Sequence, residues 1–389
     1  MEKRVAISSE VAAAVLNKKR GCGTILKGSE DLMEIPKLPF GVFVATYGSG
    51  GGAPLWRCTR IRGAEGSGKT TMAISAMKQA SLLCWRCFNL ADYCTCSESP
   101  LRMKTLYVDA EGALDPEWID ALGVPADSYY VTRTAEGGEA LDAVDSMLKA
   151  DDMGLVVIDS IAHLLPPVEV ERSIGDRKIA SQAALITDGV AKLQVRLNSE
   201  KMRGHPCLIV CTNQLRYIIG GYGNNETEAG GQAFRHWFSL GLRMSKLHTD
   251  DKYKDLKSPV KLYQRHGVRW DKEKFSTFLG AAEFLRARED IHNPKDPSEI
   301  LYKKASVMDD GVILSYLKQY NMLEPKYRVP DIYDFELERD LKGALRTPDS
   351  RYYQLHIEIT RRAKNGGRCM PGLPGADVID NEGDEISLQ

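Results

Sequence analysis

The stretch that decides the fold is Gly63-Ala64-Glu65-Gly66-Ser67-Gly68-Lys69-Thr70-Thr71, which matches the phosphate-loop pattern G-x-x-x-x-G-K-[ST] in full. Its glycines let backbone N–H groups curl around phosphates, Lys69 reaches the outer phosphates, and the Thr70 hydroxyl coordinates Mg²⁺. The helix that begins near Lys69 points the positive end of its dipole at the bound anion. Residues 63–71 are therefore predicted to contact ATP, with Mg²⁺ beside them.

Outward from this loop, short apolar runs alternate with helical patterns between about residues 55 and 244. The candidate strands are rich in β-branched and aliphatic residues and lack clean alternation, as expected of strands covered on both faces; they are 105–109, 154–159 and 207–212. The segments with helical spacing are 71–83, 137–149 and 181–198. This order predicts an α/β core with a mainly parallel sheet.

Two predicted strands end in carboxylates. Asp159 ends the strand 154–159, where open α/β sheets place their ligands, and it is predicted to hold the Mg²⁺ shell with Thr70. Asp109 and Glu111 lie at the end of the strand 105–109. Glu111 could polarise an attacking water, or one of these two acids caps the following turn; the spacing does not separate the two interpretations.

Several further motifs, in this order and spacing, resemble the RecA family of bacterial and phage-encoded DNA recombinases over about residues 24–285. They are Tyr107-Val-Asp-Ala-Glu-Gly-Ala-Leu-Asp-Pro116, Val157-Ile-Asp-Ser160, Ser173-Ile-Gly-Asp176, Thr212-Asn-Gln-Leu-Arg216, Gly220-Gly-Tyr-Gly-Asn-Asn-Glu-Thr227 and Gly230-Gly231. The resemblance implies a P-loop NTPase with a RecA-like core, an N-terminal helical arm and a C-terminal accessory region.

The resemblance also implies roles for single residues. Glu111 matches the catalytic glutamate that activates water, and it acts with Lys69 and Gln214, the latter linking the γ-phosphate to DNA. Asp115 and Trp118 match positions that contact adenine, with Trp118 in place of a tyrosine. A lysine pair that reaches ATP held by the neighbouring protomer is matched by Lys272 and Lys274; a solvated charged turn is the alternative.

Two mobile DNA-binding loops are implied around residues 171–178 and 215–231. The implied DNA contacts are Arg172, Arg177, Lys178, Arg216, Gly220, Gly221 and Gly223. The expected protein hydrolyses ATP and forms a head-to-tail filament on single-stranded DNA, with ATP at the subunit interface. It pairs that strand with a homologous duplex, and single-strand-binding and loader proteins are expected accessory partners. A helicase or motor ATPase, or a regulatory ATPase without DNA dependence, remains the alternative.

Four cysteines depart from the family pattern, because they lie where a short connection is expected. Cys84 and Cys87 form C-x-x-C, and Cys94 and Cys96 form C-x-C. Four thiolates at such spacing suit a tetrahedral Zn²⁺ site that staples an insertion. A set of free, partly buried thiols is the alternative.

Composition sets broad limits. The chain has 389 residues, and 52 Lys+Arg against 53 Asp+Glu argue against a uniformly basic coat but leave local basic loops possible. No apolar run approaches the roughly 18–20 residues that span a bilayer, and no signal peptide is evident. A cytoplasmic protein that binds no membrane is therefore expected. In that compartment its 9 cysteines are expected to be reduced or metal-bound. The expected parts are an oligomerisation arm (1–40), the core (41–285) with a cysteine-rich insertion (84–100), an accessory region (286–371) and an acidic disordered tail (372–389).

Overall fold

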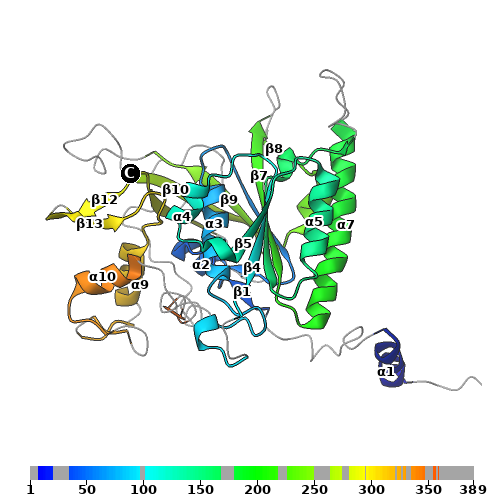
Figure 1. Cartoon of the computed structure of the whole chain (residues 1–389), viewed down its shortest axis with the longest axis horizontal. Coiled ribbons are helices and arrows are strands. Elements are labelled where there is room, and N and C mark those ends of the chain that lie inside the picture. Colours follow the sequence, from blue (N-terminus) through cyan, green and yellow to red (C-terminus); the bar gives the residue numbers. More distant parts are fainter. Residues whose placement is uncertain are drawn as a thin grey trace, which may run out of the picture.

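A large mixed sheet with helices on both faces forms the centre of the molecule (Figure 1). The computed structural model describes residues 8–20, 35–96, 101–167, 179–217, 226–248, 263–273, 280–293, 295–319, 322–325, 327–329, 334–346, 354–355 and 358. No helix in these ranges is long and apolar enough to cross a membrane.

The sheet has the strand order β11-β10-β9-β3-β7-β6-β4-β5, and β8 pairs with β7 off this path. All neighbours from β9 to β5 are parallel, whereas β10, β11 and β8 are antiparallel additions. The predicted α/β fold with a mainly parallel sheet is therefore confirmed. The strands are β3 (Cys58–Gly63), β4 (Lys104–Asp109), β5 (Tyr129–Thr132), β6 (Met153–Asp159), β7 (Leu208–Tyr217), β8 (Glu226–Glu228), β9 (Leu240–Lys246), β10 (Tyr263–Glu273) and β11 (Ala281–Ala287).

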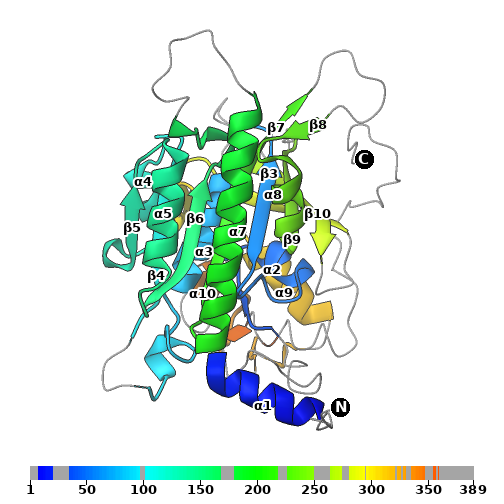
Figure 2. The same cartoon turned by 90° about the vertical axis from the view of Figure 1, so that its right-hand side faces the viewer.

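Two helices lie side by side across one face of the sheet, as Figure 2 shows; they are α5 (Gly137–Met147) and α7 (Ile179–Arg203). The other face carries α2 (Phe43–Gly48), α3 (Lys69–Ala80) and α4 (Pro116–Ala121). Smaller elements complete the described part: α1 (Ser9–Arg20), β1 (Lys37–Leu38), β2 (Ala53–Pro54), η1 (Ala91–Tyr93), η2 (Ala126–Ser128), η3 (Ile161–His163), α8 (Gly231–Trp237), β12 (Ile291–Asn293), β13 (Asp296–Tyr302), α9 (Asp310–Gln319) and α10 (Glu338–Arg346).

β6 explains why the sheet has a core on each side. All seven of its residues are buried, and successive side chains point to opposite faces. Leu155 and Val157 join the apolar cluster under α2 and α3, whereas Val156 and Ile158 join the cluster under α5 and α7. A strand covered on both faces needs apolar residues at every position, which is why its sequence shows no alternation.

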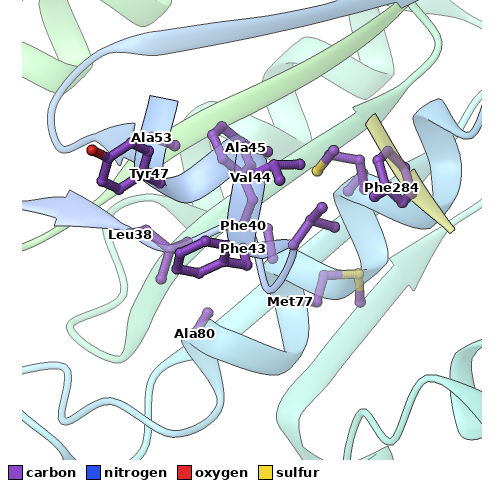
Figure 3. Packing of buried hydrophobic residues seen from close by; sticks show 14 of the residues in the cluster. Leu38, Phe40, Phe43, Val44, Ala45, Tyr47, Ala53, Met77, Ala80 and Phe284 are labelled. Carbon is purple, nitrogen blue, oxygen red and sulfur yellow. The ribbon is translucent and has the colours of Figure 1, made fainter. Parts of the chain in front are cut away.

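The described C-terminal residues share the first of these cores. Figure 3 shows that Phe43 and Tyr47 of α2 pack in the same cluster as Met77 of α3 and Phe284 of β11. Tyr316 of α9 is fully buried there, and its ring centroid lies 5.6 Å from that of Phe43 and 5.2 Å from that of Tyr47. α9 therefore covers α2 and extends the core beyond the sheet.

Candidate functional site

The phosphate loop joins the end of β3 to the start of α3, as its pattern predicts. Gly66 and Gly68 have φ values of 69° and 95°, which residues with a Cβ rarely adopt. A Cβ added to Gly63 would lie 2.4 Å from the Met244 carbonyl oxygen, so no side chain fits at that position. The glycines are therefore required by backbone shape and by close packing against β9.

Lys69 extends across the loop rather than into solvent. Its Nζ donates to the carbonyl oxygens of Gly63 (3.1 Å) and Ala64 (2.8 Å), and the residue is 8% exposed. Burial lowers the pKa of Lys69, although nearby carboxylates, first Asp159, oppose the shift. The ammonium group is held by two neutral carbonyl oxygens. A phosphate oxygen can replace them as the acceptor, because its negative charge makes the hydrogen bond stronger.

Asp159 is the centre of a buried group of oxygen atoms. Its carboxylate accepts hydrogen bonds from Thr70 Oγ1 (2.8 Å), from the Tyr107 hydroxyl (2.6 Å) and from Thr212 Oγ1. Burial, and then the adjacent Asp159, raise the pKa of Tyr107 well above its usual value, so its hydroxyl stays a donor. Carboxylate and hydroxyl oxygens are hard ligands of the kind that Mg²⁺ prefers, and Thr70 and Asp159 together fit this ion.

The structure separates the two acids that follow β4. Asp109 accepts from the backbone N–H groups of Ala113 (3.1 Å) and Leu114 (3.2 Å), and it therefore caps the turn. Glu111 makes no such cap; it is exposed, and its Oε2 lies 3.7 Å from Nδ1 of His163. Ser160 Oγ lies 2.8 Å from the same Nδ1. A serine–histidine–carboxylate relay needs both ring nitrogens, so these three residues do not form one.

A pocket of about 290 Å³ lies beside the loop. Asp115 lines it and caps α4, accepting from the Glu117 N–H at 2.9 Å, and the half-buried Trp118 stands on the first turn of that helix. The full lining is Gly66, Gly68, Lys69, Thr70, Thr71, Ile74, Ala113, Leu114, Asp115, Trp118 and Arg286. The two positions predicted to contact a base thus lie in one pocket with the residues predicted to hold phosphates.

The sequence motifs missed Arg286, which lines this pocket, and His266, which supports it from behind. The Arg286 guanidinium on β11 lies 4.7 Å from the centroid of the Trp118 ring, and its Nε donates to Nε2 of His266 at 3.3 Å. His266 Nδ1 in turn donates to the Ser67 carbonyl at 2.9 Å. Burial, and then the Arg286 charge, lower the pKa of His266 to about 4, so the ring is neutral and holds this one tautomer. No local pattern signals either residue.

Gln214 lies in β7 directly opposite Gly63, where the phosphate loop begins. Beyond it, residues 215–217 of β7 pair with β8, and Asn213 donates to the Ala229 carbonyl at 2.9 Å. The strand pair β7–β8 therefore flanks the second predicted DNA-binding loop in the chain, whose residues 218–225 fall outside the described residues.

Buried ion pairs tie β3 to β8 and to β10. Arg60 of β3, whose side chain is 5% exposed, pairs with Glu228 of β8 and with Asp271 of β10, the latter at 2.7 Å. Its guanidinium also lies 3.9 Å from the Phe238 ring centroid. The strand that leads into the phosphate loop is thus bound by charge to β8 and β10, two antiparallel strands with which it does not pair in the sheet.

The remaining predicted residues are outside the pocket or outside the described part. Lys272 lies in β10, and its Nζ donates to the Arg235 carbonyl at 2.9 Å. Lys272 therefore belongs to a strand and not to a turn, and its contact with ATP stays a prediction. The predictions at Arg172, Arg177, Lys178, Gly220, Gly221, Gly223, Lys274 and the Arg216 side chain fall outside the described residues.

The four predicted cysteines converge at the end of α3 that is remote from the loop. The Sγ atoms of Cys84, Cys87, Cys94 and Cys96 all lie within 4.8 Å of one another. All four are free thiols; Cys84 is buried and the other three are partly exposed.

Comparison with known proteins gives a consistent match. The family described as RecA N-terminal domain matches residues 7–284. Protein RecA of Clostridium acetobutylicum is 28% identical over 311 residues, 79% of this chain and 81% of that protein, and Protein RecA of Mycobacteroides abscessus is 32% identical over 313 residues, 80% of each. A Dictyostelium discoideum protein named mitochondrial DNA repair protein recA homolog is 34% identical over 245 residues, 62% of this chain but only 49% of that protein.

Proposed function

This chain belongs to the RecA family, and from that premise we propose that it is an ATP-dependent DNA recombinase. In this proposal it forms a filament on single-stranded DNA, pairs that strand with a homologous duplex and exchanges strands. ATP hydrolysis to ADP and phosphate is the covalent reaction, since strand exchange breaks no covalent bond.

The observation that carries the proposal is the register of β3 and β7. Gly63, at the start of the phosphate loop, lies opposite Gln214, and β7 continues from Gln214 into the strand pair that bears the predicted DNA-binding loop. Gln214 is proposed to contact the outer phosphate of ATP, and it lies on the strand that leads to the predicted DNA-binding loop. ATP binding can therefore shift this loop between two conformational states. The Arg60 ion pairs support the same coupling, because they join β3 to β8.

The residues of the pocket supply each part of the hydrolysis. Backbone N–H groups of residues 63–71 and the Lys69 ammonium hold the phosphates, while Trp118, with the Arg286 guanidinium packed 4.7 Å from its ring centroid, contacts the base. Mg²⁺, held by Thr70 and Asp159, neutralises charge on the phosphate oxygens when bound. Glu111 accepts a proton from the attacking water; its carboxylate is exposed and makes no cap that would occupy it.

A head-to-tail filament is supported by α1. This helix stands apart from the sheet (Figure 1), and its apolar side chains Val11 and Val15 are 54% and 60% exposed. An apolar stripe on such a helix is suited to docking on the next protomer, and heterologous contacts of this kind produce open filaments. Lys272, with Lys274, is proposed to reach ATP across that interface.

The deciding experiment measures ATP hydrolysis without DNA, with single-stranded DNA and with duplex DNA, using Lys69→Ala as the blank. We expect single-stranded DNA to stimulate turnover most strongly. Equal turnover under all three conditions would favour a regulatory ATPase and remove DNA from the proposal.

Two further measurements separate a recombinase from a helicase with the same core. Electron microscopy with single-stranded DNA should show continuous filaments, and a fluorescence assay should show exchange of homologous strands but not of unrelated ones. Closed rings that unwind a forked duplex would contradict the proposal. Gln214→Ala should keep nucleotide binding and lose the stimulation by DNA.

A further inference from the structure

The four-cysteine cluster, formed by Cys84, Cys87, Cys94 and Cys96, has a geometry that the ATPase site does not use. Tetrahedral zinc with Zn–S bonds of about 2.3 Å holds its sulfur atoms about 3.8 Å apart. The four Sγ atoms lie within 4.8 Å of one another, so small side-chain shifts complete such a tetrahedron. No other group of three or more His, Cys, Asp or Glu side chains among the described residues is arranged in this way.

The backbone around the first cysteine pair forms a tight turn. The Cys84 N–H donates to the Asn89 carbonyl at 2.7 Å, and the Phe88 N–H donates back to the Cys84 carbonyl at 2.9 Å. The Arg86 N–H points at Cys84 Sγ at 3.4 Å. Phe88 has a φ of 57°, a left-handed conformation that a residue with a side chain rarely adopts without a strong local constraint.

The cluster also joins two elements of the nucleotide site. Cys84 follows α3 and forms an antiparallel bridge with Arg102, just before β4 begins. The Arg102 guanidinium donates to the Ser81 carbonyl at 3.0 Å and to Asp92 at 2.6 Å. α3 carries Lys69 and Thr70, and β4 ends at Asp109, so this segment connects the helix of the phosphate loop to the strand that precedes Glu111.

We propose that Cys84, Cys87, Cys94 and Cys96 bind one Zn²⁺ ion that clasps the end of α3 to the start of β4. The ion cross-links the residues 84–96 and fixes the left-handed turn at Phe88. Its role is structural, because four thiolates leave no coordination position open for a substrate.

The geometry favours zinc over two other occupants of four thiols. An iron–sulfur cluster places irons and inorganic sulfides between its cysteines and separates the outer sulfurs more widely than one ion does. Two disulfides need S–S distances of about 2.05 Å between chosen pairs, whereas here all four thiols are free and share one site.

The test uses the full-length protein purified under reducing conditions without chelator. Elemental analysis should find about one zinc per chain, and the double variant Cys94→Ser, Cys96→Ser should lose it. Cys22→Ser, which removes a cysteine outside the cluster, is the matched control and should keep it. Titration of the wild-type protein with a mercurial reagent should release the zinc as the cluster thiols react.

Cobalt replacement keeps the test decisive if the double variant does not fold. Wild-type protein loaded with Co²⁺ should show the visible absorption of a tetrahedral cobalt–thiolate centre. Removal of zinc by chelator should lower the melting temperature by several degrees, and zinc should restore it. Protein without stoichiometric zinc, with iron and sulfide in its place, or with cluster cysteines oxidised to disulfides would overturn the proposal, as would a melting temperature that is independent of zinc.

Discussion

His266 gives a pH dependence of stability whose sign and size follow from its surroundings. The ring is fully buried between the phosphate loop and Phe284, and the positive charges of Arg286 and Lys246 face it. Its pKa is about 4 in the folded protein, against 6.5 as the ordinary value. The unfolded chain therefore binds a proton between these two values that the folded chain does not bind.

The sign follows from this difference. The free energy of unfolding rises with pH wherever the unfolded state holds more protons than the folded state. The stability that the neutral His266 contributes is therefore complete above the pKa of His266 in the unfolded chain. It is lost as the pH falls toward the pKa of His266 in the folded protein. The full difference corresponds to about 3 kcal/mol, since one pKa unit is worth about 1.4 kcal/mol. Between about pH 7 and about pH 5, roughly 2 kcal/mol of the unfolding free energy is lost through this residue alone.

Two assays check this prediction. NMR titration of the histidine side chains, with His266→Asn to assign the signal, gives the pKa directly. Urea unfolding at several pH values, for wild type and for His266→Asn, gives the free energies; Asn keeps a donor for Ser67 but cannot titrate. The variant should lose less stability on acidification than wild type by about 2 kcal/mol. His292→Asn controls for removal of an exposed histidine.

A His266 signal that titrates near 6.5 would refute the lowered pKa of this ring. Equal loss of unfolding free energy in wild type and in His266→Asn between the same two pH values would refute it as well. Either result would mean that the ring accepts a proton in place, at the Nε2 atom that accepts from Arg286 in the neutral form.

Three other substitutions test separate parts of the molecule. Glu111→Gln should keep ATP affinity and slow hydrolysis by about a hundredfold or more, whereas Glu117→Gln, a nearby exposed control, should not; a normal rate for the first would remove Glu111 as the base. Arg286→Ala should weaken ATP binding by about five- to thirtyfold, through loss of its contact with the pocket, and unchanged affinity in a fluorescence titration would contradict this role. Arg60→Met removes one partner from each of two buried carboxylates, although Asp271 keeps Arg62 and Glu228 keeps Arg235 at 3.7 Å. Urea unfolding should therefore show a loss of about 1–3 kcal/mol, and a loss below about 0.5 kcal/mol would contradict the buried ion pairs.

The parts of the site that sequence predicted are those in which the chemistry is local. Residues 63–71 form a phosphate loop because a short run of chain must supply amides, a cation and a hydroxyl to one anion. The strands 105–109 and 154–159 were predicted because they are buried on both faces. Their ends lie side by side in the sheet, Asp109 opposite Asp159. The sequence could not say whether Asp109 or Glu111 caps the turn, because that depends on where the N–H groups of residues 113 and 114 point.

The parts that sequence missed depend on contacts between distant segments. His266 and Arg286 belong to β10 and β11, antiparallel strands that pair beyond β9, and neither residue is part of a motif. α2 was missed for another reason: all six of its residues are buried, so it has no amphipathic pattern, and its Val44 and Thr46 favour strands. The four cysteines were found because metal ligands keep short spacings, but only the fold shows that they meet.

The bond between His266 and Ser67 joins residues 199 positions apart in the chain. A ribosome adds about 5–20 residues each second, so roughly 10 to 40 s pass between synthesis of the phosphate loop and synthesis of the strand that supports it. During that interval β3, the loop and α3 have all been made, while Arg286, which lines the pocket, and His266, which supports it, have not yet been made. The nascent chain therefore acquires its phosphate-binding half first, and the pocket can close around a whole nucleotide only after β10 and β11 have joined the sheet.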